Sequence, residues 1–140
     1  MHNLIAHALV MNEKDQVLII RRTKIKRGKV NFEGEKWDIP GGTVEELELP
    51  SYAAEREAKE EVNLDVKVER ILYEKSNLDV KKNQIYTTLI YSCRIVGDNN
   101  EIVLDLEEHD DYKWVFKDEI LAMSDDDLVS YMRELIELLC

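Results

Sequence analysis

The sequence lacks the features that define disulfide-rich, membrane-spanning and secreted proteins. Its 140 residues contain only two cysteines, Cys93 and Cys140, which neither form a disulfide framework nor have the spacing of a metal-binding cluster. No apolar run approaches the roughly 20 residues that a membrane-spanning helix needs. The N-terminus lacks a basic region and an A-x-A cleavage site, so it does not resemble a signal peptide. These absences favour a cytoplasmic protein with reduced thiols and no membrane insertion.

Positive charge is also scarce. The chain has 19 Lys and Arg against 30 Asp and Glu, which gives a net charge of −11 at pH 7. Such a surface repels nucleic acid and anionic membranes unless positive charge is concentrated locally, so we expect neither as a partner. Six basic residues gather in RRTKIKRGK, from Arg21 to Lys29. This run is either a solvated loop beside a strand or a site for an anionic group.

The chain has the length and apolar content of one globular domain, residues 1–140, with no internal repeat or linker. Apolar, β-branched runs at 3–12 and 16–22 predict a hairpin, and further strands are expected at 36–42, 65–75, 83–96, 101–106 and 112–116. The polar, glycine-containing stretch 26–35 is expected to be a loop. Strands interrupted by a few helices predict an α+β fold, with a sheet sandwiched between helices.

Two segments predict helices. Pro50 suits the first position of a helix over 50–62, where its missing N–H costs nothing. A second, amphipathic helix is expected from Asp125 to the end, with acidic residues at its N-terminus, where the helix dipole favours them. Its apolar positions are Leu128, Val129, Met132, Leu135, Ile136 and Leu139.

The first of these helices gathers like charges on one face. On a helical wheel, Arg56, Glu57, Glu60 and Glu61 fall on one arc, beside a buried stripe of small apolar residues. Glu57 and Glu61 lie one turn apart and oppose each other by about 0.2–0.5 kcal/mol. Either this is a solvated acidic face, as is common, or a divalent cation such as Mg²⁺ binds there. The preceding Pro40-Gly41-Gly42 favours the cation, because glycines adopt unusual backbone conformations and expose carbonyl groups.

The stretch from Gly42 to Leu64 resembles the Nudix box. That pattern is a glycine, five residues, Glu, seven residues, and then Arg-Glu-aliphatic-x-Glu-Glu-x-Gly-aliphatic. Its charged positions here are Glu48, Arg56, Glu57, Glu60 and Glu61, and both intervals agree. Two positions depart from the pattern: Ala58 replaces a larger aliphatic residue, and Asn63 replaces the glycine that ends the helix. Asn tolerates the left-handed conformation expected there. The resemblance implies the Nudix fold, a mixed β-sheet between α-helices in an α/β/α arrangement.

The resemblance also implies a metal site. Mg²⁺ or Mn²⁺ would be bound by Glu57, Glu60 and Glu61, together with the Gly41 carbonyl. Glu48 and Arg56 would pair to hold the helix and the preceding loop in register.

The general base is a separate question, because family members differ in which carboxylate takes that role. One candidate is Glu57. The other is Glu108, in the acidic stretch EEHDDYKWV ahead of Trp114, as a base or an additional ligand. A solvated acidic loop explains Glu108 equally well.

The implied reaction is hydrolysis of a nucleoside diphosphate linked to a group X. Arg22 and Lys26, in the basic run, are candidates for binding the terminal phosphate or X. Trp37, Phe32 or Tyr86 could stack on a base, although aromatic residues in such positions more often belong to the core or sheet.

The leading expectation for the substrate is a (deoxy)nucleoside triphosphate, cleaved to a nucleoside monophosphate and pyrophosphate by a MutT-like enzyme. Asp79 stands where ADP-ribose members often carry proline, and 80–82 lacks the tyrosine of dinucleoside-polyphosphate members. Pyrophosphatases of ADP-ribose, nucleotide sugars or dinucleoside polyphosphates are the alternatives. A non-catalytic nucleotide sensor is the alternative of another class, disfavoured because the box carboxylates are kept. Whether the chain forms a homodimer is left open.

Overall fold

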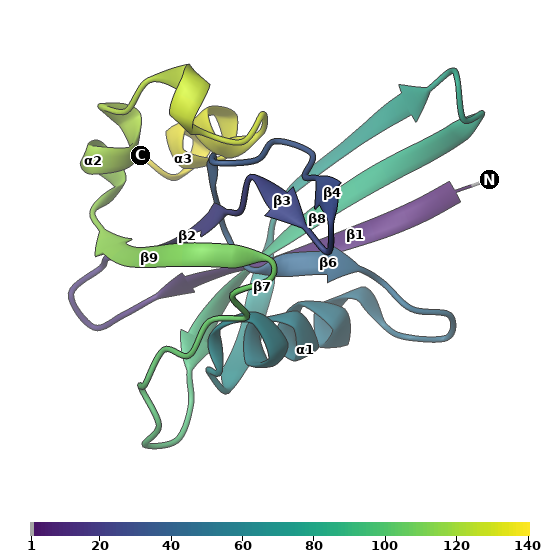
Figure 1. Ribbon diagram of the computed structural model, residues 1–140. Helices are drawn as coiled ribbons and strands as arrows, with labels where there is room; N and C mark the ends of the chain where they lie inside the picture. Colours follow the sequence, from purple (N-terminus) through teal and green to yellow (C-terminus); the bar gives the residue numbers. More distant parts are fainter. Residues whose placement is uncertain (1) are drawn as a thin grey trace.

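The computed structural model describes residues 2–140 and has a mixed sheet at its centre (Figure 1). The strand order is β5-β2-β1-β8-β7, with β6 also paired to β1 and β9 to β2. β1 runs parallel to β8 and antiparallel to β6. The strands of this sheet are β1 His2–Met11, β2 Val17–Arg22, β5 Trp37–Asp38, β6 Gly41–Thr43, β7 Val66–Asp79, β8 Gln84–Ile95 and β9 His109–Val115.

Helices cover both faces of this sheet. α1, Pro50–Val62, lies on one side, and α2, Lys117–Leu121, and α3, Met132–Leu139, lie on the other (Figure 1). The mixed sheet between helices that the sequence predicts is therefore confirmed. No helix within residues 2–140 combines the length and the hydropathy needed to cross a membrane.

The alternation of side chains along β1 and β2 divides the core into two parts. Leu9 and Ile19 pack in the cluster that includes Leu135 and Ile136 of α3. Ala8 and Leu18, one position away, pack in the other cluster with the small residues of α1. The predicted hairpin is formed, although its two strands pair only beside the turn, at Met11 and Val17. Farther from the turn β1 pairs with β6 instead of β2, which brings Gly41 and Gly42 opposite His7 and Ala6, while β8 pairs along the whole length of β1.

The C-terminal helix begins later than predicted. Asp125–Asp127 form one turn of 3₁₀ helix, in which the Ser124 hydroxyl accepts a hydrogen bond from the Asp126 N–H at 3.2 Å. Leu128 then forms a parallel bridge with Trp37, and the Val129 N–H donates to the Trp37 carbonyl at 3.1 Å. Pairing with the sheet edge thus replaces helix here, while both side chains are still buried.

Two further expectations need correction, and one short helix was not predicted. Residues 101–106 form no strand, because the Val103 N–H donates to the Val62 carbonyl at the end of α1, and Ile102 and Leu104 pack against that side of the core. The expected loop at 26–35 includes part of a small hairpin of β3, Ile25–Lys26, and β4, Lys29–Val30. α2, only five residues long, is too short to give a helical periodicity in the sequence.

The end of α1 is as expected. Asn63 adopts φ 64° and ψ 25°, the left-handed conformation, and its N–H donates to the Lys59 carbonyl at 3.0 Å. Its side-chain amide also donates to the Glu101 carbonyl at 3.3 Å. The departure from glycine at this position therefore keeps the same helix ending.

We expect Asn63→Gly to leave the melting temperature unchanged or slightly higher, because glycine adopts this conformation without a steric penalty. The matched variant Asn63→Ala should lower stability, since a left-handed alanine costs roughly 1–2 kcal/mol. Thermal denaturation of both variants checks this. A melting temperature several degrees lower for Asn63→Gly would contradict the role assigned to the backbone of Asn63.

Candidate active site

A cleft of about 1400 Å³ opens between α1, the segment 22–43 and the β7–β8 hairpin. The box carboxylates Glu57, Glu60 and Glu61 lie along one wall. The facing hairpin contributes the basic residues Lys75, Lys81 and Lys82. His7 of β1, Glu108 and His109 at the start of β9, and residues 129–131 ahead of α3 complete the lining.

Arg56 contacts two of the three carboxylates of the acidic wall, which consists of Glu57, Glu60 and Glu61. Its Nε and Nη2 donate to the two oxygens of Glu48 at 2.7 and 2.9 Å, so the expected Glu48–Arg56 pair is formed, with two-point geometry. Its Nη1 donates to Glu57 at 2.9 Å and to Glu60 at 3.2 Å. Hydrogen bonds from Arg56 lower the pKa of Glu48 to about 2. Arg56 therefore fixes the loop before α1 against the helix and offsets the repulsion among its carboxylates.

Glu61 is in a different position from its neighbours. Its side chain is buried, with the residue only 4% exposed, and it accepts a hydrogen bond from the Gly41 N–H at 3.0 Å. Burial raises the pKa of Glu61 well above its ordinary value, and the nearby carboxylates of Glu57 and Glu108 raise it further. Burial also raises the pKa of Glu57, against the opposing effect of Arg56. Within residues 2–140, no basic side chain forms an ion pair with Glu61.

The two glycines before the helix are needed for close packing. A Cβ on Gly41 would lie 2.3 Å from Nδ1 of His7, and one on Gly42 would lie 2.7 Å from Oε1 of Glu57. Neither adopts a positive φ, unlike Gly28 and Gly97, so the expectation of an unusual glycine backbone here is wrong. Their lack of a side chain instead lets the β6 backbone approach the carboxylates closely.

These residues fit a divalent cation, although their side chains do not form a complete coordination site. Among the described residues, no three His, Cys, Asp or Glu side chains come close enough together to hold a metal ion. Arg56 draws Glu57 and Glu60 toward itself, while the Gly41 N–H holds Glu61. Mg²⁺ is commonly bound by one or two carboxylates, with water and substrate phosphates as further ligands, so a preformed cage is not required. A buried carboxylate without a basic partner suits such an ion.

Glu108 and Lys26, both predicted site residues, lie together on the cleft. The Nζ of Lys26 is 2.7 Å from Oε1 of Glu108. The charge of Glu108 also contributes to the raised pKa values of Glu57 and Glu61, which places it near the acidic wall. Glu108 therefore lies near the box residues, although the two are far apart in the sequence. A site residue has to lie there, whereas a residue of a solvated loop does not.

The two other predicted substrate contacts are placed differently. All three guanidinium nitrogens of Arg22 bond within the protein: to Asp38 at 3.2 Å, to Asn31 at 3.0 Å and to the Phe32 carbonyl at 2.8 Å. Trp37 is 8% exposed and packs in the core beside Leu128, and it does not line the cleft. The indole packs in the same core cluster as Leu128, and the Nζ of Lys113 lies 4.5 Å from its ring centroid. Phe32 and Tyr86, the other aromatic candidates, do line the cleft.

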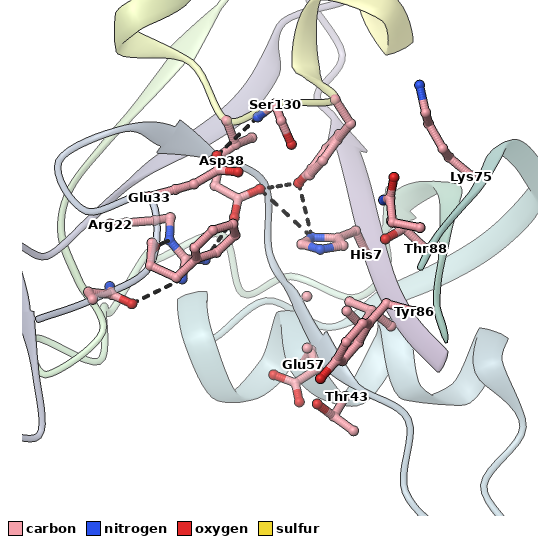
Figure 2. A pocket seen from close by; sticks show the side chains of 18 of the residues that line it. His7, Arg22, Glu33, Asp38, Thr43, Glu57, Lys75, Tyr86, Thr88 and Ser130 are labelled. Carbon is pink, nitrogen blue, oxygen red and sulfur yellow. Dashed lines mark hydrogen bonds and ion pairs between the residues drawn. The ribbon is translucent and has the colours of Figure 1, made fainter. Parts of the chain in front are cut away.

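A buried polar cluster at the cleft was missed from the sequence (Figure 2). The Tyr131 hydroxyl donates to Asp38 and lies 3.3 Å from Nδ1 of His7, which in turn lies 2.9 Å from the Ile39 carbonyl. Burial raises the pKa of Tyr131 well above its ordinary value, so its hydroxyl stays protonated and able to donate. The residues come from three distant segments, and the only local signal is Asp38, a charged residue within an otherwise apolar strand.

Comparison with known proteins identifies the family that this chain matches. Residues 1–139 match the model of the NUDIX domain. An uncharacterized Nudix hydrolase from Listeria innocua serovar 6a is 38% identical over 65 residues, which are 46% of this chain and 36% of that protein. The chain thus matches only about a third of that relative's length.

Solved structures extend the likeness to the whole chain. The MutT protein from Methanosarcina mazei Go1 aligns with a TM-score of 0.76 and 27% identity, over 97% of this chain and 91% of its own. A MutT NUDIX hydrolase from Burkholderia pseudomallei aligns over 100% and 99%, with a TM-score of 0.76 and 21% identity, and shares the fold.

The unpaired burial of Glu61 leads to a test that requires no substrate. A carboxyl group whose pKa is raised by folding favours the folded state at low pH, and that contribution is lost as the pH rises through the raised value. In metal-free, mildly alkaline buffer, Glu61→Gln should therefore raise the melting temperature, by about 3 °C or more. Glutamine keeps an oxygen that can accept the Gly41 N–H but carries no charge.

Thermal denaturation across a pH series measures this effect, with Glu46→Gln on the exposed loop as the control. The control should follow the wild type at every pH. A Glu61→Gln variant that melts below the wild type in alkaline buffer would show that the Glu61 charge is compensated within the protein, which would remove the electrostatic reason for a cation beside it.

Proposed function

The chain belongs to the NUDIX domain family, and we propose that it is a metal-dependent pyrophosphohydrolase of a nucleoside diphosphate linked to X. The leading substrates are (deoxy)nucleoside triphosphates, with a nucleoside monophosphate and pyrophosphate as products. The observation that carries this proposal is the placement of Glu57, Glu60 and Glu61 along one wall of the cleft, beside Gly41 and Gly42.

The chemistry follows from the charges. An acidic wall repels a polyphosphate, so the wall can take part in phosphoryl chemistry only with cations between the two. Bound Mg²⁺ or Mn²⁺ supplies charge neutralisation, polarises the phosphoryl oxygens and activates a water molecule. Glu57, Glu60, Glu61 and the Gly41 carbonyl are the residues that would hold it. Arg56, fixed by Glu48, orients the helix so that these groups face the cleft.

We propose Glu57 and Glu108 as the two candidates for the group that accepts the proton of the attacking water. Glu57 belongs to the proposed metal ligands, whereas Glu108 approaches from the start of β9 and pairs with Lys26. Glu108→Gln should lower turnover and leave metal affinity unchanged if Glu108 is the base, and should lower both if Glu108 is a ligand.

The size of the cleft supports a nucleotide ligand linked to a further group. Its volume exceeds the roughly 300–1,000 Å³ of typical small-molecule pockets, which leaves room for a nucleotide and an attached group. Lys81 and Lys82, in the turn between β7 and β8, line the cleft and offer positive charge to the terminal phosphates, whereas the Nζ of Lys75 already lies 3.5 Å from Glu134. In a chain with a net charge of −11, two adjacent lysines at the cleft are consistent with an anionic ligand.

A nucleotide panel assayed with Mg²⁺ or Mn²⁺ tests the proposal. We expect pyrophosphate and a nucleoside monophosphate from nucleoside triphosphates, with no turnover when the metal is chelated. Glu57→Gln should lower kcat by about 100-fold or more, because it removes a metal ligand and a candidate base together. Glu46→Gln, on the exposed loop, should leave kcat at the wild-type value.

Other results would point elsewhere. Release of a nucleoside monophosphate from ADP-ribose, a nucleotide sugar or a dinucleoside polyphosphate, but not from triphosphates, would replace the leading substrate class. Tight nucleotide binding without turnover of any compound in the panel would contradict hydrolysis and indicate a sensor.

A further inference from the structure

The backbone of Gly41 points away from β1 and toward the acidic wall. The Ala8 N–H donates to the Pro40 carbonyl at 2.8 Å, so these two residues form a hydrogen-bonded pair. Such pairs alternate with non-hydrogen-bonded ones in an antiparallel ladder, so the next pair, His7 and Gly41, exchanges no hydrogen bonds. The N–H and the carbonyl of Gly41 therefore both point to the other side, where the N–H donates to Glu61 at 3.0 Å.

The His7 side chain holds the strand that carries this peptide. Its imidazole packs directly on Gly41, where a Cβ would collide with the ring. Its Nδ1 lies 2.9 Å from the Ile39 carbonyl. A carbonyl can only accept, so Nδ1 carries the hydrogen and donates it. His7 thus fixes the backbone two residues before Gly41 and covers Gly41 itself.

Tyr131 and Asp38 in turn fix His7 (Figure 2). The Tyr131 hydroxyl donates to Asp38, its oxygen lies 3.3 Å from Nδ1 of His7, and the two rings pack with their centroids 5.3 Å apart. Asp38 also accepts from the Ile39 N–H at 2.7 Å and from Arg22 at 3.2 Å. His7, Asp38 and Tyr131, the polar cluster, therefore bond both to one another and to the segment that enters β6.

The backbone before Tyr131 is itself held. The Val129 N–H donates to the Trp37 carbonyl at 3.1 Å, and the Ser130 N–H donates to the Glu33 carboxylate at 3.0 Å. Two successive residues are thus bonded to segments on either side of β5. The Tyr131 hydroxyl is therefore presented to Asp38 and His7 from a fixed backbone.

The polar cluster lies close to the acidic wall. The charge of Asp38 contributes to the raised pKa of Glu61, and Gly41, three residues after Asp38, is the hydrogen-bond partner of Glu61. The cluster and the acidic wall therefore meet at the Gly41 peptide.

We propose that His7 and Tyr131 are positioning residues for the cation site, because they hold the segment 38–41 so that the Gly41 carbonyl faces the cation. This inference rests on the proposed function for the cation itself. Neither residue is a proposed ligand, and both act through the backbone of Ile39 and Gly41. Groups that orient a metal ligand by hydrogen bonds typically change metal affinity by about 10- to 100-fold when they are removed.

Titration of the whole chain with Mn²⁺ alone, followed by the electron paramagnetic resonance signal of the free ion, tests the proposal. His7→Phe keeps a ring but removes the donor, and Tyr131→Phe removes only the hydroxyl. Each should weaken Mn²⁺ binding by about 10-fold. The control is Tyr73→Phe, which loses a hydrogen bond to Glu134 at 3.0 Å, outside the contacts of the segment 38–41. It should keep the wild-type affinity.

A second substitution of His7 separates hydrogen bonding from packing. The side-chain amide of His7→Asn can donate to the Ile39 carbonyl in place of Nδ1, although it fills less space than a ring. His7→Asn should therefore bind Mn²⁺ more tightly than His7→Phe. A role limited to packing predicts the reverse order, and that order would overturn the proposal.

Hydrogen exchange of the Gly41 N–H, measured by nuclear magnetic resonance on the metal-free protein, gives a readout that needs no cation. This N–H is bonded to Glu61 in the wild type. Tyr131→Phe and His7→Phe should speed its exchange by roughly 10-fold, whereas Tyr73→Phe should not. Unchanged exchange in both variants would overturn the proposal, whatever the metal titrations show.

These outcomes are distinct from failure of the proposed function. A wild type that binds Mn²⁺, with an affinity that neither His7→Phe nor Tyr131→Phe lowers, would overturn the positioning role and leave the proposed function intact. A loss of affinity shared by Tyr73→Phe would also overturn it, because a general loss of stability would then explain the effect. A wild type that binds no Mn²⁺ would contradict the proposed function and with it the cation that this positioning serves.

Discussion

The crowding of carboxylates on α1 is the constraint on which the site depends. Glu57, Glu60 and Glu61 lie within little more than one helical turn, and the protein compensates them unequally. Arg56 contacts the first two, whereas Glu61 is buried with a single backbone N–H as its partner. A buried, charged carboxylate is costly unless it is paired or binds a cation, and this cost is the physical ground on which we propose a cation beside Glu61.

The surrounding fold serves the same constraint. β6 can pass next to Glu57 and His7 only because Gly41 and Gly42 carry no side chains, and its pairing with β1 fixes that approach. Glu48, from the loop before the helix, holds Arg56 by two hydrogen bonds. The small residues of α1 let the helix pack closely on the sheet, so its acidic face is held at the edge of the cleft.

Sequence reasoning succeeded where the information is local. The box spacing, the limits of α1 and the left-handed Asn63 all depend on residues within one or two turns of each other. It failed where distant segments decide the outcome. Leu128 and Val129 have helical periodicity, but Leu128 is extended and bridged to Trp37, and Trp37 itself packs in the core away from the cleft. The contacts among His7, Asp38 and Tyr131 join residues up to 124 positions apart, which no motif records. Arg22 looked like a free cation because its three acceptors are brought to it only by folding.

The most direct test of the central claim is a crystal structure grown with Mn²⁺ and a non-hydrolysable nucleoside triphosphate, with the anomalous signal used to locate the metal. We expect an ion within coordination distance of Glu57 and Glu61, with phosphate oxygens among its other ligands and Glu57 turned away from Arg56. A bound nucleotide with no ion among these side chains, or an ion held elsewhere in the cleft, would contradict the claim that α1 is built around a cation.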